Sequence, residues 1–319
     1  MNTRTLGRTG LEVSEIGLGT WAFNSWIYGE VDNQEAIRSI RTALDLGINF
    51  FDTAPLYGVG REDGVAERVL GQGLGTDRDR SIISTKFGRN PSMEGAHFNG
   101  RRARESVEES LQRLGTDRID ILFFHSPFGP HEIDDDVWAA LDDLKQAGKI
   151  RAVGHSISLF KDTEGMAREW ARDRKIDVIQ VVLSLMNREA LPLINDLGAA
   201  GIGIVARECL ANGFLSGAIT GDTIFPEGSL NARYSREEIV ERAGYAEALK
   251  GVLVRDDVPT LPRAALRWVL DQPQVSLALT GAKNVDELRD GAAASDAATY
   301  SEDELRKVAD LHRRDFSPA

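Results

Sequence analysis

The sequence predicts a (β/α)8 barrel, the TIM-barrel fold, as a single domain over residues 1–319. Short β-rich runs alternate with amphipathic helical stretches along nearly the whole chain, and strict alternation of this kind indicates a parallel sheet. With EIGLGT as the first strand, the alternation gives eight βα units, the number in a closed barrel. An open doubly wound sheet is disfavoured, because the early glycine-rich segment GLGTWAFNSW does not fit the G-x-G-x-x-G fingerprint.

The elements follow one another in a regular order. Within residues 3–18, two short strands around the turn GRTG are expected to form a hairpin ahead of the barrel. Further strands are expected at Asn49–Asp52, Ser81–Lys86, Ile119–His125, Ile150–Ser156, Val178–Leu183, Gly203–Ala206 and Ser276–Thr280. Helices are expected between them, at Asn33–Leu46, Gly64–Gln72, Gly100–Leu114, Asp134–Ala147, Lys161–Asp173 and Ala190–Ala199.

Two segments show how these boundaries are chosen. In DNQEAIRSIRTALDLG, Asp32 or Asn33 can cap a helix, apolar residues recur at helical spacing, and Gly47 can end it. The stretch from Ala218 to Val258 is long and polar for a connection between a strand and its helix. We expect an extended loop there, after the seventh strand, with a helical part near Ser235–Leu253.

Composition narrows the class of protein. The formal net charge is -12, from 50 acidic residues against 38 lysines and arginines, which argues against sequence-independent nucleic-acid binding. A single cysteine, Cys209, excludes an internal disulfide or a cysteine-built zinc site, and no other metal site is expected. The start of the chain has no secretory h-region, and no apolar run is long enough to span a membrane. A cytoplasmic protein is expected, and a monomer is compatible with the sequence.

Ionisable residues follow three neighbouring predicted strands. Asp52 ends the second strand, Tyr57 lies on the loop after it, Lys86 ends the third strand and His125 ends the fourth. Each residue alone has an ordinary explanation as a turn residue, a solvated lysine or a core histidine. Together they are hard to explain structurally, because the burial of unpaired charges is costly. The carboxyl ends of barrel strands are also where catalytic residues lie.

The four residue types suit proton transfer to a carbonyl oxygen. A phenol has a reference pKa of ~10, and a nearby ammonium such as that of Lys86 stabilises the phenolate and lowers this pKa. Asp52 can keep Lys86 charged, and His125 can orient the substrate oxygen. No side chain in the set can donate hydride, so a nicotinamide cofactor is expected.

Seven segments carry a resemblance to the aldo-keto reductase family over nearly the whole chain: RTLGRTGLEVSEIGLGTWAF, FFDTAPLYG, STKFG, FFHSP, QVVLSLMNRE, GIGIVARECLANGFLSG and LALTGAKNVDEL. The resemblance implies that Asp52, Tyr57, Lys86 and His125 form the catalytic tetrad. Tyr57 is then the proton donor in reduction and the base in oxidation. It also implies that an extended nicotinamide cofactor binds across the barrel mouth.

The resemblance also implies where the cofactor is held. Ser156 and Gln180 match residues that bind the nicotinamide carboxamide, and Leu210 and Gly213 match the loop that binds the pyrophosphate. Three departures stand out: Ile157 replaces an asparagine, Leu183 replaces a stacking aromatic residue, and Glu208-Cys209 replaces Ser-Pro. An acid beside a pyrophosphate is unfavourable unless the side chain of Glu208 points away or meets a cation such as Arg207, and Arg207 is itself expected at the cofactor site.

The segment TGAKNVDELRDG matches the region that binds the adenosine end of the cofactor, and its matching residues are Gly281, Lys283, Glu287 and Asp290. Lys283 stands where the family often has an arginine for the 2′-phosphate of NADP. Glu287 argues mildly against that phosphate, because its charge would repel it. NADP is therefore expected, with NADPH favoured modestly and NAD as the alternative.

The substrate is expected to be a small carbonyl compound or a sugar. Trp21, Trp26 and Phe128 lie on loops at the predicted barrel mouth and suggest a partly aromatic pocket, although ordinary packing would also explain each ring. Two other functions stay open. One is a regulatory protein that uses the barrel as a nicotinamide sensor, and the other is a sugar-modifying enzyme with a transient redox step.

Overall fold

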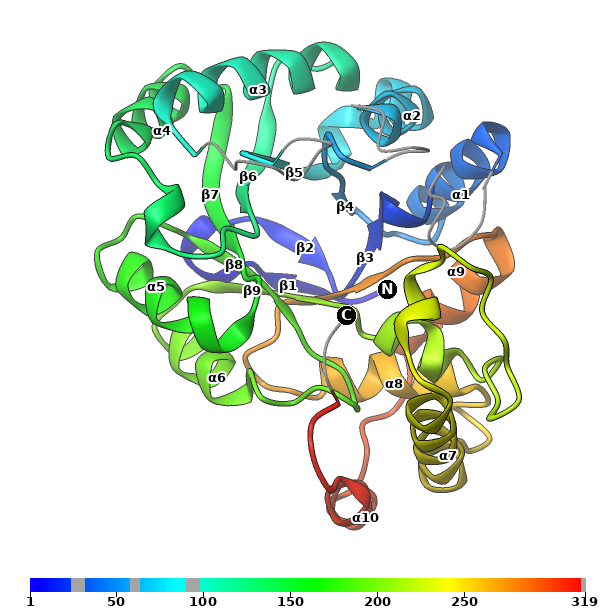
Figure 1. Ribbon diagram of the computed structural model, residues 1–319. Helices are drawn as coiled ribbons and strands as arrows, with labels where there is room; N and C mark the ends of the chain where they lie inside the picture. The colour runs from blue at the N-terminus through cyan, green and yellow to red at the C-terminus, as the bar shows by residue number, and fades with distance from the viewer. Residues whose placement is uncertain (24–31, 58–63, 90–97, 317–319) are drawn as a thin grey trace.

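The computed structural model describes residues 1–23, 32–57, 64–89 and 98–316. The described residues form a closed barrel of eight parallel strands, which confirms the predicted fold class. Helices surround the ring of strands (Figure 1). The strands, in barrel order, are β10 (Leu277–Thr280), β3 (Ile16–Gly19), β4 (Phe50–Asp52), β5 (Ile82–Phe87), β6 (Ile119–His125), β7 (Ile150–Ser156), β8 (Val178–Val182) and β9 (Gly203–Arg207).

An antiparallel hairpin of β1 (Thr3–Thr5) and β2 (Glu12–Ser14) precedes the barrel, as predicted. Its apolar side chains pack with inward-facing residues of the barrel strands, so the hairpin closes the amino-terminal end of the barrel. Gly7 is needed there: its φ is +49°, and a Cβ would lie 2.3 Å from the backbone nitrogen of Gly203. The shared cluster contains Leu6, Leu11, Val13, Phe50, Phe123 and Leu277.

Amphipathic helices cover the outside of the barrel and bury a second, larger hydrophobic cluster against the strands. They are α1 (Asn33–Asp45), α2 (Val65–Leu74), α3 (Gly100–Leu114), α4 (Asp136–Gln146), α5 (Phe160–Arg172), α6 (Leu191–Ala199), α8 (Leu261–Leu270) and α9 (Val285–Ala292). The apolar stripe predicted for α1 is the buried face of that helix. No helix in the described ranges is long and apolar enough to cross a membrane.

Two further helices lie outside the regular βα alternation. The long connection after β9, the seventh barrel strand, carries α7 (Arg236–Leu253), close to the predicted helical part. Ser235 begins this helix with a capping box to Glu238. A similar box of Ser301 and Glu304 begins α10 (Glu302–Leu311) near the end of the chain.

The strand register brings the predicted site residues together at the carboxyl ends of the strands. Asp52 pairs with Ser84 across β4 and β5, and His125 pairs with Ser156 across β6 and β7. A cavity of about 340 Å³ lies at the other end of the barrel, where Glu12, Asn49 and Asp120 are among its lining residues. That cavity lies at the opposite end of the barrel from Asp52, Lys86 and His125, so it is not part of the predicted active site.

Candidate active site

A buried ion pair joins the ends of β4 and β5. The ammonium of Lys86 lies 2.8 and 2.7 Å from the two carboxylate oxygens of Asp52 and donates to the carbonyl oxygen of Thr53 at 2.9 Å. Lys86 is 1% exposed and Asp52 is 4% exposed. A lysine so deeply buried stays charged only with a partner of this kind.

Two neutral donors complete the surroundings of Asp52. Its Oδ1 accepts from the hydroxyl of Ser84 at 2.7 Å and from Nε2 of Gln180 at 2.9 Å. Burial lowers the pKa of Lys86, but the charges of Asp52 and Tyr57 more than offset it, and the pKa lies above its ordinary value. The ammonium of Lys86 is therefore charged and held in a fixed position at the barrel mouth.

Tyr57 lies beside this charge. The Lys86 nitrogen is 4.9 Å from the centroid of the Tyr57 ring, and the ring meets His125 edge-on with centroids 6.0 Å apart. Burial raises the pKa of Tyr57 and Asp52 adds to the rise, while Lys86 and Arg207 lower it; the net pKa is above 10. The expected lowering of this pKa is therefore wrong for the cofactor-free protein. Lys86 acts in the expected direction, but the loss of hydration outweighs it.

His125 ends β6 on the other side of Tyr57. The loss of hydration lowers the pKa of His125 well below its ordinary value, and the charges of Lys86, Arg89 and Arg207 lower it further. The imidazole is therefore neutral near pH 7, with one N–H donor and one acceptor nitrogen. Such a ring can hydrogen-bond to a substrate oxygen without competing with Tyr57 as a proton donor.

A hydrogen-bonded chain connects the predicted carboxamide residues to the tetrad. The hydroxyl of Ser156 donates to Oε1 of Gln180 at 3.2 Å, while Nε2 of Gln180 donates to Asp52. Ser156 and Gln180 are 2% and 1% exposed. Among the described residues, the amide nitrogen of Gln180 makes this one hydrogen bond, and it has a second N–H that a ligand could use.

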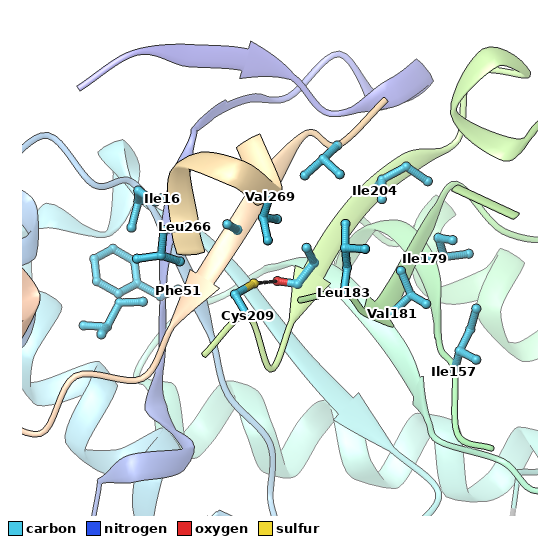
Figure 2. Close-up of a cluster of buried hydrophobic side chains, with 14 of the residues drawn as sticks. Ile16, Phe51, Ile157, Ile179, Val181, Leu183, Ile204, Cys209, Leu266 and Val269 are labelled. Atoms are coloured by element: carbon cyan, nitrogen blue, oxygen red, sulfur yellow. Dashed lines mark hydrogen bonds between the residues drawn. The ribbon is translucent and has the colours of Figure 1, made fainter. Parts of the chain in front are cut away.

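Residues at all three departures from the family pattern contribute to the packing of the hydrophobic core. Ile157, Leu183 and Cys209 all belong to a buried hydrophobic cluster (Figure 2). Burial raises the pKa of the Cys209 thiol to about 12, and the thiol donates to the carbonyl oxygen of Ala206 at 3.4 Å. Cys209 is thus a packing residue, because a thiol with so high a pKa is a poor nucleophile.

The loop after β9 has an unusual backbone. Glu208, Ala211 and Asn212 have φ values of 55°, 48° and 54°, and Gly213 follows with a φ of 93°. Left-handed residues other than glycine are uncommon and concentrate at functional loops. Glu208 forms an ion pair with Arg207, and it also accepts from Asn212 at 3.3 Å. Of the two possibilities for Glu208, the structure shows the one in which its carboxylate meets Arg207.

The start of α9 already holds a carboxylate. Glu287 accepts from the backbone N–H of Lys283 at 3.0 Å, and Asn284 caps the helix by accepting from the N–H of Glu287 at 2.9 Å. A helix start is a natural anion site, and here the chain itself supplies an anion. Lys283 is exposed, and a Cβ added to Gly281, two residues before it, would lie 4.0 Å from the Cβ of Ala22.

Asp290 points toward α8 in this structure. Its carboxylate accepts from Arg263 at 2.7 Å and from the hydroxyl of Thr260 at 2.6 Å. Leu210 is partly buried against the hydrophobic core. Contacts of Asp290 and Leu210 with a cofactor therefore remain predictions.

The predicted aromatic residues have different positions. Trp21 lies 6.3 Å from Tyr57 between ring centroids, so it is next to the tetrad. Phe128 is 48% exposed and lies against the guanidinium of Arg89, 4.0 Å from its ring centroid. Trp26 lies outside the described residues.

Arg89 is a buried residue near the site that the sequence analysis does not identify. The signal that could have indicated it is its place in STKFGR, three residues after Lys86.

Comparison with known proteins assigns the family. The model of the aldo/keto reductase family matches residues 15–313. The NADH-specific methylglyoxal reductase of Escherichia coli (strain K12) is 34% identical over 313 residues, covering 91% of this chain and 92% of that protein. L-galactose dehydrogenase of Arabidopsis thaliana is 31% identical over 298 residues, covering 91% and 87%.

A solved structure supports the same assignment. The glycerol dehydrogenase AKR11B4 from Gluconobacter oxydans matches with a TM-score of 0.76 at 29% identity, covering 97% of this chain and 94% of that chain. The family match extends over nearly the entire barrel, and the relatives are matched over most of their own length. The chain belongs to the aldo/keto reductase family.

Proposed function

We propose that the protein is an NAD(P)-dependent oxidoreductase that interconverts the carbonyl and alcohol forms of a small aldehyde, ketone or sugar, with Tyr57 as the general acid or base. The observation that carries this proposal is the buried Asp52–Lys86 pair beside the ring of Tyr57. A buried cation next to a phenol has an evident use where the phenol must give up a proton.

In reduction, Tyr57 donates its proton to the substrate oxygen as that oxygen gains negative charge. Lys86 stabilises the phenolate that is left, and Asp52 keeps Lys86 charged. His125 hydrogen-bonds the same substrate oxygen and orients the carbonyl. A reduced nicotinamide, when bound, supplies the hydride. Because the pKa of Tyr57 is above 10, the phenol carries its proton at neutral pH and is ready for reduction.

The residues at the mouth fit a nicotinamide dinucleotide. Gln180 would hold a carboxamide beside the hydroxyl of Ser156, and the loop after β9, with its left-handed residues, would hold the pyrophosphate. The α9 start can bind an anion, but here the chain's own Glu287 takes that place. The amide and hydroxyl groups of Gln180 and Ser156 are of the kind that the carboxamide of the cofactor requires.

We infer that NADH binds more tightly than NADPH. The side chain of Lys283 favours NADPH, because its charge attracts a 2′-phosphate. The backbone N–H of the same residue, however, donates to the carboxylate of Glu287, which weighs against a phosphate at that place. That phosphate would have to displace the carboxylate or lie beside it. The similar reductase from Escherichia coli is described as NADH-specific, which agrees with this inference.

A substrate panel tests the proposal. Three of the similar proteins are named for methylglyoxal, L-galactose and glycerol, so the panel should contain methylglyoxal, glyceraldehyde and aldoses, each with NADH and NADPH. We expect cofactor-dependent turnover that is followed by the nicotinamide absorbance, faster with NADH. Tight cofactor binding without turnover of any carbonyl or alcohol would instead favour a sensor.

A further inference from the structure

The carboxylate of Asp52 accepts more hydrogen bonds than its ion pair with Lys86 supplies. Its Oδ1 accepts from the hydroxyl of Ser84 at 2.7 Å and from Nε2 of Gln180 at 2.9 Å, in addition to the ammonium of Lys86 at 2.8 Å. Both additional donors are buried. The reaction proposed above gives Ser84 no role, and it uses Gln180 only for the carboxamide of the cofactor.

The two donors reach this oxygen from opposite sides of the barrel. Ser84 lies on β5, where it is the register partner of Asp52 and precedes Lys86 by two residues, so both side chains point to the same face of the strand. Gln180 lies on β8, the strand opposite β4 in the barrel order. Hydrogen bonds from two sides restrict rotation of the carboxylate, so both of its oxygens stay in contact with Lys86.

These donors also affect the charge that Tyr57 experiences. The negative charge of Asp52 opposes ionisation of the phenol, whereas the positive charge of Lys86 favours it. A hydrogen-bond donor directs the positive end of its dipole at the carboxylate and so compensates part of the negative charge. The compensation is effective in a buried site, because water screens little there.

The effect on Tyr57 passes through Asp52. The ionisable groups that face Tyr57 come from four strands: Asp52 from β4, Lys86 from β5, His125 from β6 and Arg207 from β9. Of these four, within the described residues, the side chains of Ser84 and Gln180 hydrogen-bond to Asp52 alone.

We propose that Ser84 and Gln180 are positioning residues that act through Asp52: their hydrogen bonds fix its carboxylate against Lys86 and compensate part of its negative charge, so that the charge of Lys86 prevails at Tyr57. The inference rests on the proposed function, since it concerns the same proton transfer. Its consequence is that loss of either donor makes the Tyr57 phenolate less stable, although all four residues of the tetrad remain.

Thr85 provides a matched control on the same strand. Its buried hydroxyl donates to Oε1 of Glu67 at 2.6 Å, so it also makes a hydroxyl–carboxylate bond out of contact with water. This bond lies on the other face of β5, because side chains alternate along a strand. Ser84→Ala and Thr85→Val each remove one such hydroxyl. Both should lower the urea midpoint to a similar degree, but only Ser84→Ala should affect Tyr57.

Ionisation of Tyr57 is followed in the cofactor-free protein by NMR of tyrosine labelled at the phenolic carbon. The chain has five tyrosines, and the signal of Tyr57 is the one that is lost in Tyr57→Phe. We expect Ser84→Ala and Gln180→Met each to raise the pH at which Tyr57 ionises by about half a unit, a roughly threefold loss of phenolate stability. The alkaline limb of kcat/KM for alcohol oxidation, at saturating cofactor, should move in the same direction.

A second background tests whether the effect passes through Asp52. In the double variant Asp52→Asn/Lys86→Met, both charges of the pair are gone, and the further change Ser84→Ala should leave the ionisation of Tyr57 where it is. A shift of Tyr57 that persists in this background would mean that Ser84 acts on the phenol directly, which would overturn the inference.

An unchanged ionisation of Tyr57 in either Ser84→Ala or Gln180→Met would also overturn it. So would an equal shift in Thr85→Val, because that would indicate a general loosening of β5. If one of the two donor variants does not fold, the other decides alone. Failure of the proposed function looks different, because then Tyr57 titrates as expected while no carbonyl or alcohol is turned over with either cofactor.

Discussion

At the scale of single residues, the site depends on how burial and charge compete. Burial acts against the charged form of Lys86, yet Asp52 holds its ammonium at 2.7 Å and the net effect raises the pKa. For Tyr57, burial decides that the pKa is raised, because the charge of Lys86 lowers this pKa while the charge of Asp52 raises it. The sequence could indicate which groups meet, but the degree to which loops exclude water is known only from the folded chain.

Lys86→Met should shift the alkaline limb of alcohol oxidation to higher pH and slow the reaction on the order of 100-fold or more. Oxidation needs the Tyr57 phenolate, so its rate rises with pH up to the pKa of Tyr57, and Lys86 is the main charge that lowers this pKa. The kcat/KM for oxidation, measured from neutral to alkaline pH, checks this. Since the groups are coupled, the limb belongs to the cluster.

Lys86→Met also leaves Asp52 as a buried charge without its partner, which costs about 3–5 kcal/mol of stability. The double variant Asp52→Asn/Lys86→Met is the control, because it removes both charges and should recover much of the lost stability in urea denaturation. An oxidation profile with its limb at the wild-type pH in Lys86→Met would mean that Lys86 does not tune Tyr57.

At the scale of elements, the start of α9 carries the proposed preference for NADH. Asn284 and Glu287 both bond to backbone N–H groups there, so the helix start is closed by the chain's own side chains. Sequence reasoning recognised this helix start and the opposing charges of Lys283 and Glu287. It could not show that Glu287 folds back onto the N–H of Lys283, since that depends on the path of the turn after β10.

Glu287→Gln should improve NADPH binding about tenfold relative to NADH, because it removes a negative charge from the place where a 2′-phosphate would lie. Lys283→Ala should weaken NADPH binding and leave NADH nearly unchanged. Fluorescence titration of both cofactors in wild type and the two variants measures this. An unchanged NADPH-to-NADH ratio in both variants would place the 2′ position of the cofactor elsewhere.

At the scale of the whole molecule, the barrel follows from the regular alternation of strands and helices. The predicted boundaries of the barrel strands and helices coincide with the observed ones or differ by at most two residues, because buried parallel strands and amphipathic helices carry clear periodic patterns. The buried ion pair of Arg89 and Glu132 was harder to predict. A buried arginine such as Arg89 has no periodic signal, and its partner Glu132 is separated from it by 43 positions.

His155 allows a test of the packing of the whole molecule, because this buried histidine takes up a proton at mildly acidic pH only when the chain unfolds. It is fully buried, and neither ring nitrogen has a hydrogen-bond partner within the described residues. Burial lowers its pKa to about 3. The unfolded chain, with an ordinary pKa of ~6.5, therefore binds more protons between these values. Stability is lost as pH falls through this window, by up to ~1.4 kcal/mol per pH unit from this residue.

His155→Leu should make the free energy of unfolding less dependent on pH between about 6.5 and 4, measured by urea denaturation. His125 also resists protonation, so part of the pH dependence should remain. His131→Leu, at an exposed position, is the control and should leave the slope unchanged. A slope equal to that of wild type in His155→Leu would show that water reaches this ring in solution.

The most direct measurement of the central claim compares Tyr57→Phe with wild type for both cofactor binding and carbonyl reduction. The substitution removes only the phenolic hydroxyl, so NADH should bind within about twofold of wild type while kcat/KM falls by about 10²–10⁴-fold. The Asp52–Lys86 pair does not need the hydroxyl, so the fold and its stability should be kept. Reduction near the wild-type rate in Tyr57→Phe, with chemistry rate-limiting, would contradict the role of Tyr57 as proton donor.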